Sequence, residues 1–239
     1  MNKPVIPTMQ GPARLKILSG NTEVSVACVV SAKVEEEFGR ISSAEIVLDD
    51  GGFDNDSFAI SNADELLVGK NIEVCIGNDM DADVLFKGIV VRQRIRIDDN
   101  TRQLVITAKH GAVKMTRVRQ NRCFADKADS DIVKDVVGEY SLDVEIEDTS
   151  VAHETMMQYN ATDWDFINMR IEANGQMLYC STKGLVSRVP NVSADPVLEI
   201  DNGYNLINLD VEMDASQAFD SYVSRTWNYN SQSVEEEEL

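Results

Sequence analysis

The residues most suggestive of an ion site are the alternating carboxylates of the run Asp79-Met80-Asp81-Ala82-Asp83. An EF-hand loop continues with a glycine, which makes a sharp turn, and ends on an acidic twelfth residue that binds Ca²⁺ through both oxygens. Val84 and Val90 occupy these two positions here. A solvated hairpin loop is therefore the better interpretation, and we expect neither a metal nor a cofactor.

Three arginines, Arg92, Arg94 and Arg96, alternate along a single predicted strand and therefore share one of its faces. The other face carries mostly apolar side chains. A basic stripe can bind nucleic acid, but single-stranded binding also needs aromatic side chains for base stacking, and this region has none. We predict an exposed face that pairs with carboxylates of the chain's own acidic half or of a neighbouring subunit.

No known catalytic set is present. The chain has no Gly-x-Ser-x-Gly elbow, no phosphate-binding glycine loop and no His-Glu-x-x-His pair. Its four cysteines are each more than forty residues apart and only two histidines are available, which argues against zinc. We predict that the protein is not an enzyme, although two of the 41 acidic side chains could meet in space as they do in glycosidases.

Charge is divided unevenly along the chain. The net charge is −19, and residues 120–239 hold 24 acidic against 7 basic side chains, whereas residues 1–119 are nearly neutral. Such an excess of acid disfavours nucleic-acid partners. The first residues contain no apolar run, so we expect no signal peptide. No segment approaches the roughly 20 apolar residues that cross a bilayer. We expect a protein made in the cytoplasm, without stable membrane insertion, unless an injection machine exports it.

The elements that must hold these side chains are mostly strands in the first half. Apolar and polar residues alternate there, which predicts antiparallel strands joined by short turns and one helical turn at 64–67. The predicted strands are 15–17, 24–38, 44–48, 72–76, 84–97 and 104–108. This pattern favours a tube-like antiparallel β-barrel.

The middle of the chain changes to helical spacing. We predict helices over 130–140, capped by Ser130, and 163–174, capped by Thr162. A strand over 142–146 follows the first helix, and a hairpin follows the second. Further strands are expected over 197–200, 206–213 and 222–229, and the Glu235–Glu238 run is interpreted as a solvated tail or a cut end. Trp164, Trp227, Tyr204 and Tyr229 are expected in the core.

One segment is distinctive: the run Gln158-Tyr159-Asn160-Ala161-Thr162-Asp163-Trp164-Asp165-Phe166-Ile167, followed by Arg170 and by Glu172-Ala173-Asn174-Gly175. It resembles the "QYN-x-x-D-x-x-F…R…E-x-N-G" segment of Vgr-type tail-spike proteins and phage late-control proteins. Residues 85–90, 109–116, 129–133 and 218–232 resemble other segments of that family in the same order. His110 stands where the family usually has Asp.

The resemblance spans about residues 10–232 and implies a structural role. It implies an α+β, mainly β fold with a first β-barrel (1–119), an α+β insertion (120–192) and the incomplete start of a second β-barrel (193–239). It also implies a homotrimeric baseplate hub of a type VI secretion or phage-tail-like contractile injection system. Such a hub joins a hexameric tube protein to a spike or needle domain.

Two other functions stay open at this point. A carbohydrate- or peptide-binding β module would need an exposed aromatic cleft, and only 6% of the residues are aromatic. A tail-associated wall hydrolase would need a pair of catalytic carboxylates. If the arginine face is a subunit contact, reversing the charge of Arg92, Arg94 and Arg96 should weaken assembly.

Overall fold

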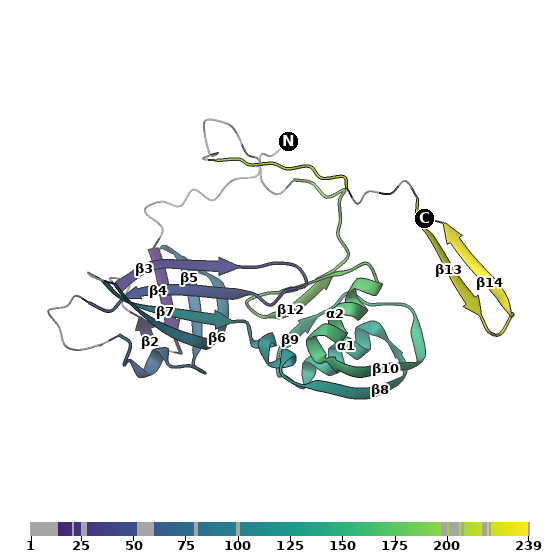
Figure 1. Ribbon diagram of the computed structural model, residues 1–239, viewed down its shortest axis with the longest axis horizontal. Helices are drawn as coiled ribbons and strands as arrows, with labels where there is room; N and C mark the ends of the chain where they lie inside the picture. The colour runs from purple at the N-terminus through teal and green to yellow at the C-terminus, as the bar shows by residue number, and fades with distance from the viewer. Residues whose placement is uncertain are drawn as a thin grey trace. The chain divides into compact units, whose positions relative to one another are not determined.

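The chain divides into two units in the computed structural model (Figure 1). Residues 7–194 form the larger unit, and residues 195–239 with residues 1–6 form the smaller one. The structure describes residues 14–20, 22–24, 28–51, 60–78, 81–98, 101–196, 200, 206, 208–216, 219 and 221–238. The division into three parts at residues 119 and 192 stays a prediction.

Seven antiparallel strands form the first part of the larger unit. They are β1 (Arg14–Ser19), β2 (Thr22–Val24), β3 (Val29–Glu35), β4 (Ser43–Asp49), β5 (Asn71–Asn78), β6 (Asp81–Asp98) and β7 (Thr101–Lys109). Their order in the sheet is β2-β1-β5-β6-β7-β4-β3. The predicted fold class, α+β and mainly β, is confirmed. The predicted helical turn is the short helix η2 (Asp64–Leu66).

Alternating side chains of these strands bury one face of the sheet. The core consists of aliphatic residues and one aromatic ring, all nearly inaccessible to solvent: Ile17, Ala44, Ile46, Leu48, Leu66, Ile72, Val74, Phe86, Val90, Leu104, Ile106 and Ala108. Each large apolar side chain buried in this way stabilises the fold by about 1.5–3 kcal/mol. The alternation of apolar and polar residues in the sequence therefore predicts correctly which face of the sheet is buried.

The two outer strands of the sheet are neighbours in the chain. Residues 25–28 separate β2 from β3, and a segment of that length spans about 18 Å at most. In a flat sheet with strands about 4.8 Å apart, the outer two of seven strands would lie about 29 Å apart. The sheet must therefore curl strongly. Within the described residues no ladder joins β2 to β3, so a curled sheet stands where we expected a closed barrel.

A bulge in β6 decides which way its arginines face. The first half of β6 pairs with β5 and the second half with β7, and the register shifts between Val90 and Arg92. Residues two apart on a regular strand share a face. The extra residue, Val91, lets Val90 lie in the core while Arg92 lies on the outer surface.

The second part of the larger unit mixes helices with short strands. Its elements are η3 (Gly111–Thr116), β8 (Arg119–Ala128), α1 (Asp129–Gly138), β9 (Asp143–Glu145), β10 (Ala152–Thr162), α2 (Asp163–Ala173), β11 (Met177–Cys180) and β12 (Gly184–Arg188). Strands β8 and β10 form an antiparallel ribbon, and β11, β12 and β9 form a three-stranded sheet. Sequence periodicity missed both strands of the ribbon. Neither α1 nor α2 is long and apolar enough to cross a membrane.

The predicted cap of one helix is confirmed and that of the other is wrong. The Thr162 hydroxyl accepts a hydrogen bond from the Asp165 backbone N–H at 3.1 Å, as an N-cap does. Ser130 instead lies inside the first turn of α1, which begins at Asp129. Its own backbone N–H donates to the Thr149 hydroxyl at 3.0 Å. A loop side chain thus satisfies one of the free donors at this helix start.

The loop between β3 and β4 joins the curled sheet to the α+β part. The Gly39 backbone N–H donates to the Leu178 carbonyl at 2.7 Å, and the Asn168 amide donates to the Gly39 carbonyl at 3.0 Å. Gly39 has a φ of +67°, which disfavours residues with a side chain. Phe38 packs edge-to-face on Tyr179, with ring centroids 6.0 Å apart. Backbone and aromatic contacts therefore fix this junction.

In the smaller unit, β13 (Val223–Asn228) and β14 (Ser233–Glu238) form an antiparallel hairpin. The Glu235–Glu238 run is therefore part of a strand that pairs with β13 and not a free tail, although its side chains are solvent-exposed, as predicted. The described residues of 206–213 form no strand, and Tyr204 and residues 197–199 lie outside the described residues. Trp227 is half exposed and Tyr229 is exposed, so neither is in the core, whereas Trp164 is buried.

Candidate functional site

The distinctive run at 158–167 places one carboxylate at the centre of a buried network. Asp163, the first residue of α2, is fully buried. It accepts hydrogen bonds from Gln158 Nε2 at 2.7 Å, from Arg122 at 3.0 and 3.2 Å and from the Tyr140 hydroxyl at 2.5 Å. Burial, together with the hydrogen bond to Asp163, raises the pKa of Tyr140 to about 12. Tyr140 therefore keeps its hydroxyl proton at neutral pH and donates it to Asp163.

A second carboxylate is bound in a similar way at the start of α1. Asp129 accepts two hydrogen bonds from the Arg170 guanidinium, at 2.6 and 2.8 Å, and one from Asn174 at 2.9 Å. His153 Nε2 lies 3.1 Å from the same carboxylate. Burial alone would raise the pKa of Asp129, but the hydrogen bonds from Arg170, Asn174 and His153 outweigh it and hold that pKa well below its usual range.

These contacts give the distinctive segment a structural role. Three of its residues, Gln158, Arg170 and Asn174, donate to the carboxylates of Asp163 and Asp129, which tie α1, α2 and the β8–β10 ribbon together. Both carboxylates are saturated with donors, so neither is free to act as a general base or to bind a metal. The sequence pattern identifies the segment itself. The residues that its side chains contact lie up to 45 residues away, and no local signal in the sequence identifies them.

His110 caps the short helix η3. It is the N-cap of η3, and its Nδ1 accepts a hydrogen bond from the Ala112 backbone N–H at 3.3 Å. The neutral ring therefore carries its proton on Nε2. Burial lowers the pKa of His110, against a smaller opposite effect of its hydrogen bond to the backbone of Ser181.

The three predicted contact arginines lie where the sequence put them, on one exposed face of β6. Arg92 donates to the Thr107 hydroxyl at 3.3 Å, and none of Arg92, Arg94 and Arg96 forms an ion pair with a described carboxylate. On the opposite face Ile95 and Ile97 are about half exposed, because the far end of β6 extends beyond the core. The structure brings the three guanidiniums to one face, and no carboxylate of the described residues pairs with them.

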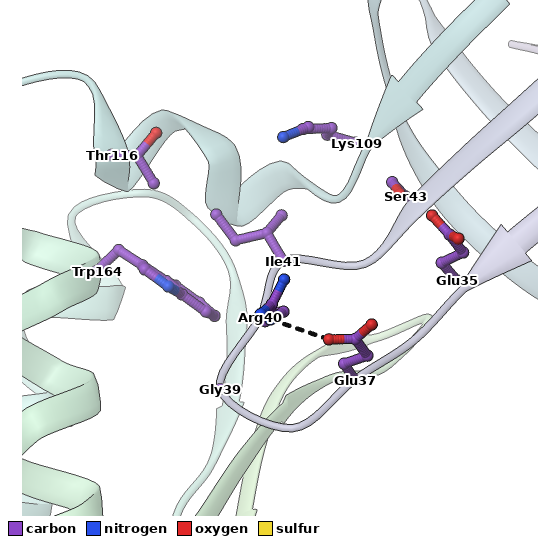
Figure 2. A pocket seen from close by; sticks show the side chains of 9 residues that line it. All are labelled: Glu35, Glu37, Gly39, Arg40, Ile41, Ser43, Lys109, Thr116 and Trp164. Carbon is purple, nitrogen blue, oxygen red and sulfur yellow. Dashed lines mark ion pairs between the residues drawn. The ribbon is translucent and has the colours of Figure 1, made fainter.

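An open groove of about 450 Å³ lies beside the β3–β4 loop (Figure 2). It is lined by Glu35, Glu37, Gly39, Arg40, Ile41, Ser43, Lys109, Thr116 and Trp164. Arg40 pairs with Glu37 at 2.9 Å across the mouth. Only 6% of Trp164 is exposed, so it offers no flat ring on which a sugar could stack. This is not the aromatic cleft that a carbohydrate-binding module requires.

The residues that the structure describes give little support for a metal site or for a reactive cysteine. No cluster of three His, Cys, Asp or Glu residues occurs there, although Asp79 of the alternating acidic run lies outside it. Cys75 and Cys180 are buried, Cys28 is partly buried, Cys123 is exposed, and no two are bonded. Burial raises the pKa of both Cys75 and Cys180, so their reactive thiolate forms are scarce at neutral pH.

Solved structures with a similar fold are tail proteins. The 43 kDa tail protein of prophage MuSo2 from Shewanella oneidensis matches 89% of this chain with a TM-score of 0.73 and 11% identity. A tail protein from Neisseria meningitidis MC58 matches 95% with a TM-score of 0.69 and 15% identity. The E. coli c3393 protein, a component of the type VI secretion system, matches 72% with a TM-score of 0.54 and 14% identity.

These likenesses establish the fold. The chain spans 63%, 67% and 48% of the lengths of the three solved chains, in that order. No curated protein matches the sequence significantly. The sequence profile of the Alg8 N-terminal domain matches residues 10–239, which is nearly the whole chain. The chain therefore belongs to the Alg8 N-terminal domain family.

Proposed function

We propose that this chain is a structural component of a contractile injection apparatus, the hub that links the tube protein to the puncturing spike. The observation that carries the proposal is the fold, which follows a prophage tail protein over 89% of the chain with a TM-score of 0.73. The likeness to a type VI secretion component supports the same class of machine. The chain would be assembled into the machine in the cytoplasm.

A non-catalytic role is consistent with how the polar side chains are used. The buried carboxylates Asp129 and Asp163 bind donors of their own fold. The groove beside the β3–β4 loop is open and lined by charges, of which Arg40 and Glu37 already pair. These side chains position helices and loops, which is what a rigid assembly component needs.

The proposed assembly has three kinds of contact. The chain would form a homotrimer, bind a hexameric tube protein on one side and join a spike on the other. We assign the subunit contact to the face of Arg92, Arg94 and Arg96, because these exposed guanidiniums have no ionic partner among the described residues. Nucleic acid is not expected as a partner, because the net charge is −19.

The test is assembly of the machine in the source organism. Interrupting the gene should abolish sheathed particles seen by electron microscopy of cell lysates, and supplying the wild-type chain should restore them. A tagged wild-type chain should also co-purify with the tube protein of the same machine. Normal numbers of full-length particles without the chain would refute the proposed role.

A further inference from the structure

A short stretch of this acidic chain is purely basic. Residues 101–125 contain two lysines and four arginines but no Asp or Glu, in a chain whose net charge is −19. Three of these side chains, Lys114, Arg117 and Arg119, are exposed. They lie between the last turn of the short helix η3 and the start of β8. Positive charge is therefore concentrated on one short exposed segment of the α+β part.

These three cations have no carboxylate partner among the described residues. The next basic residue shows the contrast, because Arg122 pairs with Asp163 at 3.0 Å and with Glu139 at 2.7 Å. Arg119 donates to the backbone carbonyl of Asn160 at 2.7 Å, which is a neutral acceptor. In the ribbon register Arg119 lies opposite Thr162, so β10 places no carboxylate across from it. The positive charge of this segment is left for a partner.

A β-bulge in β10 holds an aromatic side chain beside the same segment. The Asn160 backbone N–H donates to Asn121 Oδ1 at 2.8 Å, and its carbonyl accepts from Arg119. Asn160 has a φ of +47°, and the register shifts at this point. The neighbouring Tyr159 is 76% exposed. An exposed tyrosine on a backbone that is held in place is typical of a residue that anchors a protein interface.

Strand β8 also has an edge at which a further strand can pair. The ribbon consists of β8 and β10 alone, so each strand has a ladder partner on one side only, as far as the structure describes the chain (Figure 1). On the outer face of the ribbon, Cys123 lies opposite Met157, and both are exposed. The backbone groups of a strand edge pair readily with another extended chain. This geometry favours an extended segment as the ligand.

We propose that the edge of β8 binds an extended acidic segment of a different protein. Its carboxylates pair with Lys114, Arg117 and Arg119, and an apolar side chain of the segment packs on the outer face of the ribbon. This contact is separate from the face of β6 and does not rest on the proposed hub function. It adds a partner that recognises the chain by charge and by strand pairing.

A peptide segment fits this surface better than a nucleic acid does. A nucleic acid is a long polyanion, and the remainder of a chain with a net charge of −19 repels it. A short acidic segment meets mainly the local positive charge, because interactions beyond about 8 Å are screened in physiological salt. Exposed ion pairs are individually weak. We therefore expect a dissociation constant of roughly 10 μM to 1 mM, with a strong dependence on salt.

The experiment uses a fluorescent peptide of about ten residues in which threonine and glutamate alternate. Fluorescence anisotropy with the full chain should show binding in about 0.05 M salt and at least about tenfold weaker binding in about 0.5 M salt. A matched peptide with glutamine in place of glutamate should bind at least about tenfold more weakly. The acidic peptide with N-methyl groups on alternate backbone nitrogens should also lose binding, because it cannot pair along a strand edge.

Variants of the chain locate the site. The double variant K114E and R117E should weaken binding of the acidic peptide at least about tenfold, because like charges then meet. The matched control K70E and R94E reverses two exposed cations of the curled sheet, with the same change in net charge. It should bind within about twofold of wild type. Circular dichroism should report an unchanged fold in both variants.

Cys123 supplies a local measurement, because it is exposed on β8. A saturating concentration of the acidic peptide should slow the labelling of Cys123 by a maleimide at least about threefold, and the glutamine peptide should not. Peptide mass spectrometry assigns the label to this residue. Protection of Cys123 places the bound peptide on the ribbon.

Four results would overturn the inference. They are no binding of the acidic peptide in low salt, equal losses in the two double variants, undiminished binding of the N-methylated peptide, and binding that leaves Cys123 unprotected. Tighter binding of a ten-nucleotide single-stranded DNA would assign the surface to nucleic acid and would also overturn it. None of these results bears on whether particles require the chain, so the proposed function is tested separately.

Discussion

The two parts of the larger unit handle buried charge differently. Among the described residues of the curled sheet, the core cluster is apolar, and the buried carboxylate of Asp50 accepts the backbone N–H groups of Ile60 and Ser61 at 2.7 and 3.1 Å. In the α+β part, Asp129 and Asp163 each bind an arginine beside the apolar core. Apolar packing fills space with little directional preference, whereas a buried ion pair fixes how its elements are oriented.

The largest expected effect concerns the network around Asp163. The substitution D163A should lower the free energy of unfolding by about 3–5 kcal/mol, because it removes the buried acceptor that Arg122 and two further donors share. Urea unfolding followed by circular dichroism measures the change. E139Q removes the exposed partner of the same arginine and should cost less than about 1 kcal/mol. Equal effects of the two substitutions would contradict a special role for burial.

The corresponding change in the sheet removes packing alone. Ile106 is fully buried, and I106A should lower the free energy of unfolding by about 3 kcal/mol through lost apolar contacts and the cavity left behind. I106V should cost about 1 kcal/mol. Both losses should be the same from pH 4 to pH 8, as measured by urea titrations. A loss that varies with pH would show that the sheet is also stabilised by charge.

A smaller effect, of about 2 kcal/mol, is expected at Asp129. Its pKa in the folded chain is lower than in the unfolded chain, so its contribution is fully present above the unfolded value of about 3.9 and is lost as pH falls below it. D129N should therefore be less stable than wild type at pH 6, and the difference should shrink towards pH 2. Melting temperatures across this range test it, and parallel curves would contradict the assignment.

The smallest effect, about 1 kcal/mol, is expected at the cap His110. Its folded pKa is lowered, so the unfolded chain takes up the proton first, and stability falls as pH drops below about 6.5. H110N keeps a cap acceptor but does not titrate. It should flatten the stability profile between pH 7 and pH 5, as measured by thermal unfolding. A profile as steep as that of wild type would assign the acid sensitivity to another group.

Sequence periodicity predicted the part of the fold in which burial alternates. The strands of the curled sheet follow the expected order because one face is buried along most of their length. Strands β8 and β10 were missed because their outer face is solvent-exposed and holds Cys123, Met157 and Tyr159. β14 was missed because four consecutive glutamates carry no alternation, and its order comes from pairing with β13.

The candidate sites were predictable to different degrees. The exposure of Arg92, Arg94 and Arg96 follows from alternation along a strand, together with a bulge that the sequence does not reveal. The network around Asp163 was not predictable, because Arg122 lies 41 residues away and only tertiary folding brings it near. Contacts of that kind depend on topology, which a single sequence specifies only through many weak preferences.

Each part of the larger unit also contains one buried thiol, Cys75 in β5 and Cys180 in β11, whereas Cys123 is exposed. A maleimide reagent should modify Cys123 at once and should reach the other two only when their surroundings open. The labelling rates of Cys75 and Cys180, resolved by peptide mass spectrometry, therefore measure the local opening of the sheet and of the α+β part separately. The native chain thus contains its own pair of reporters for asking which half unfolds first.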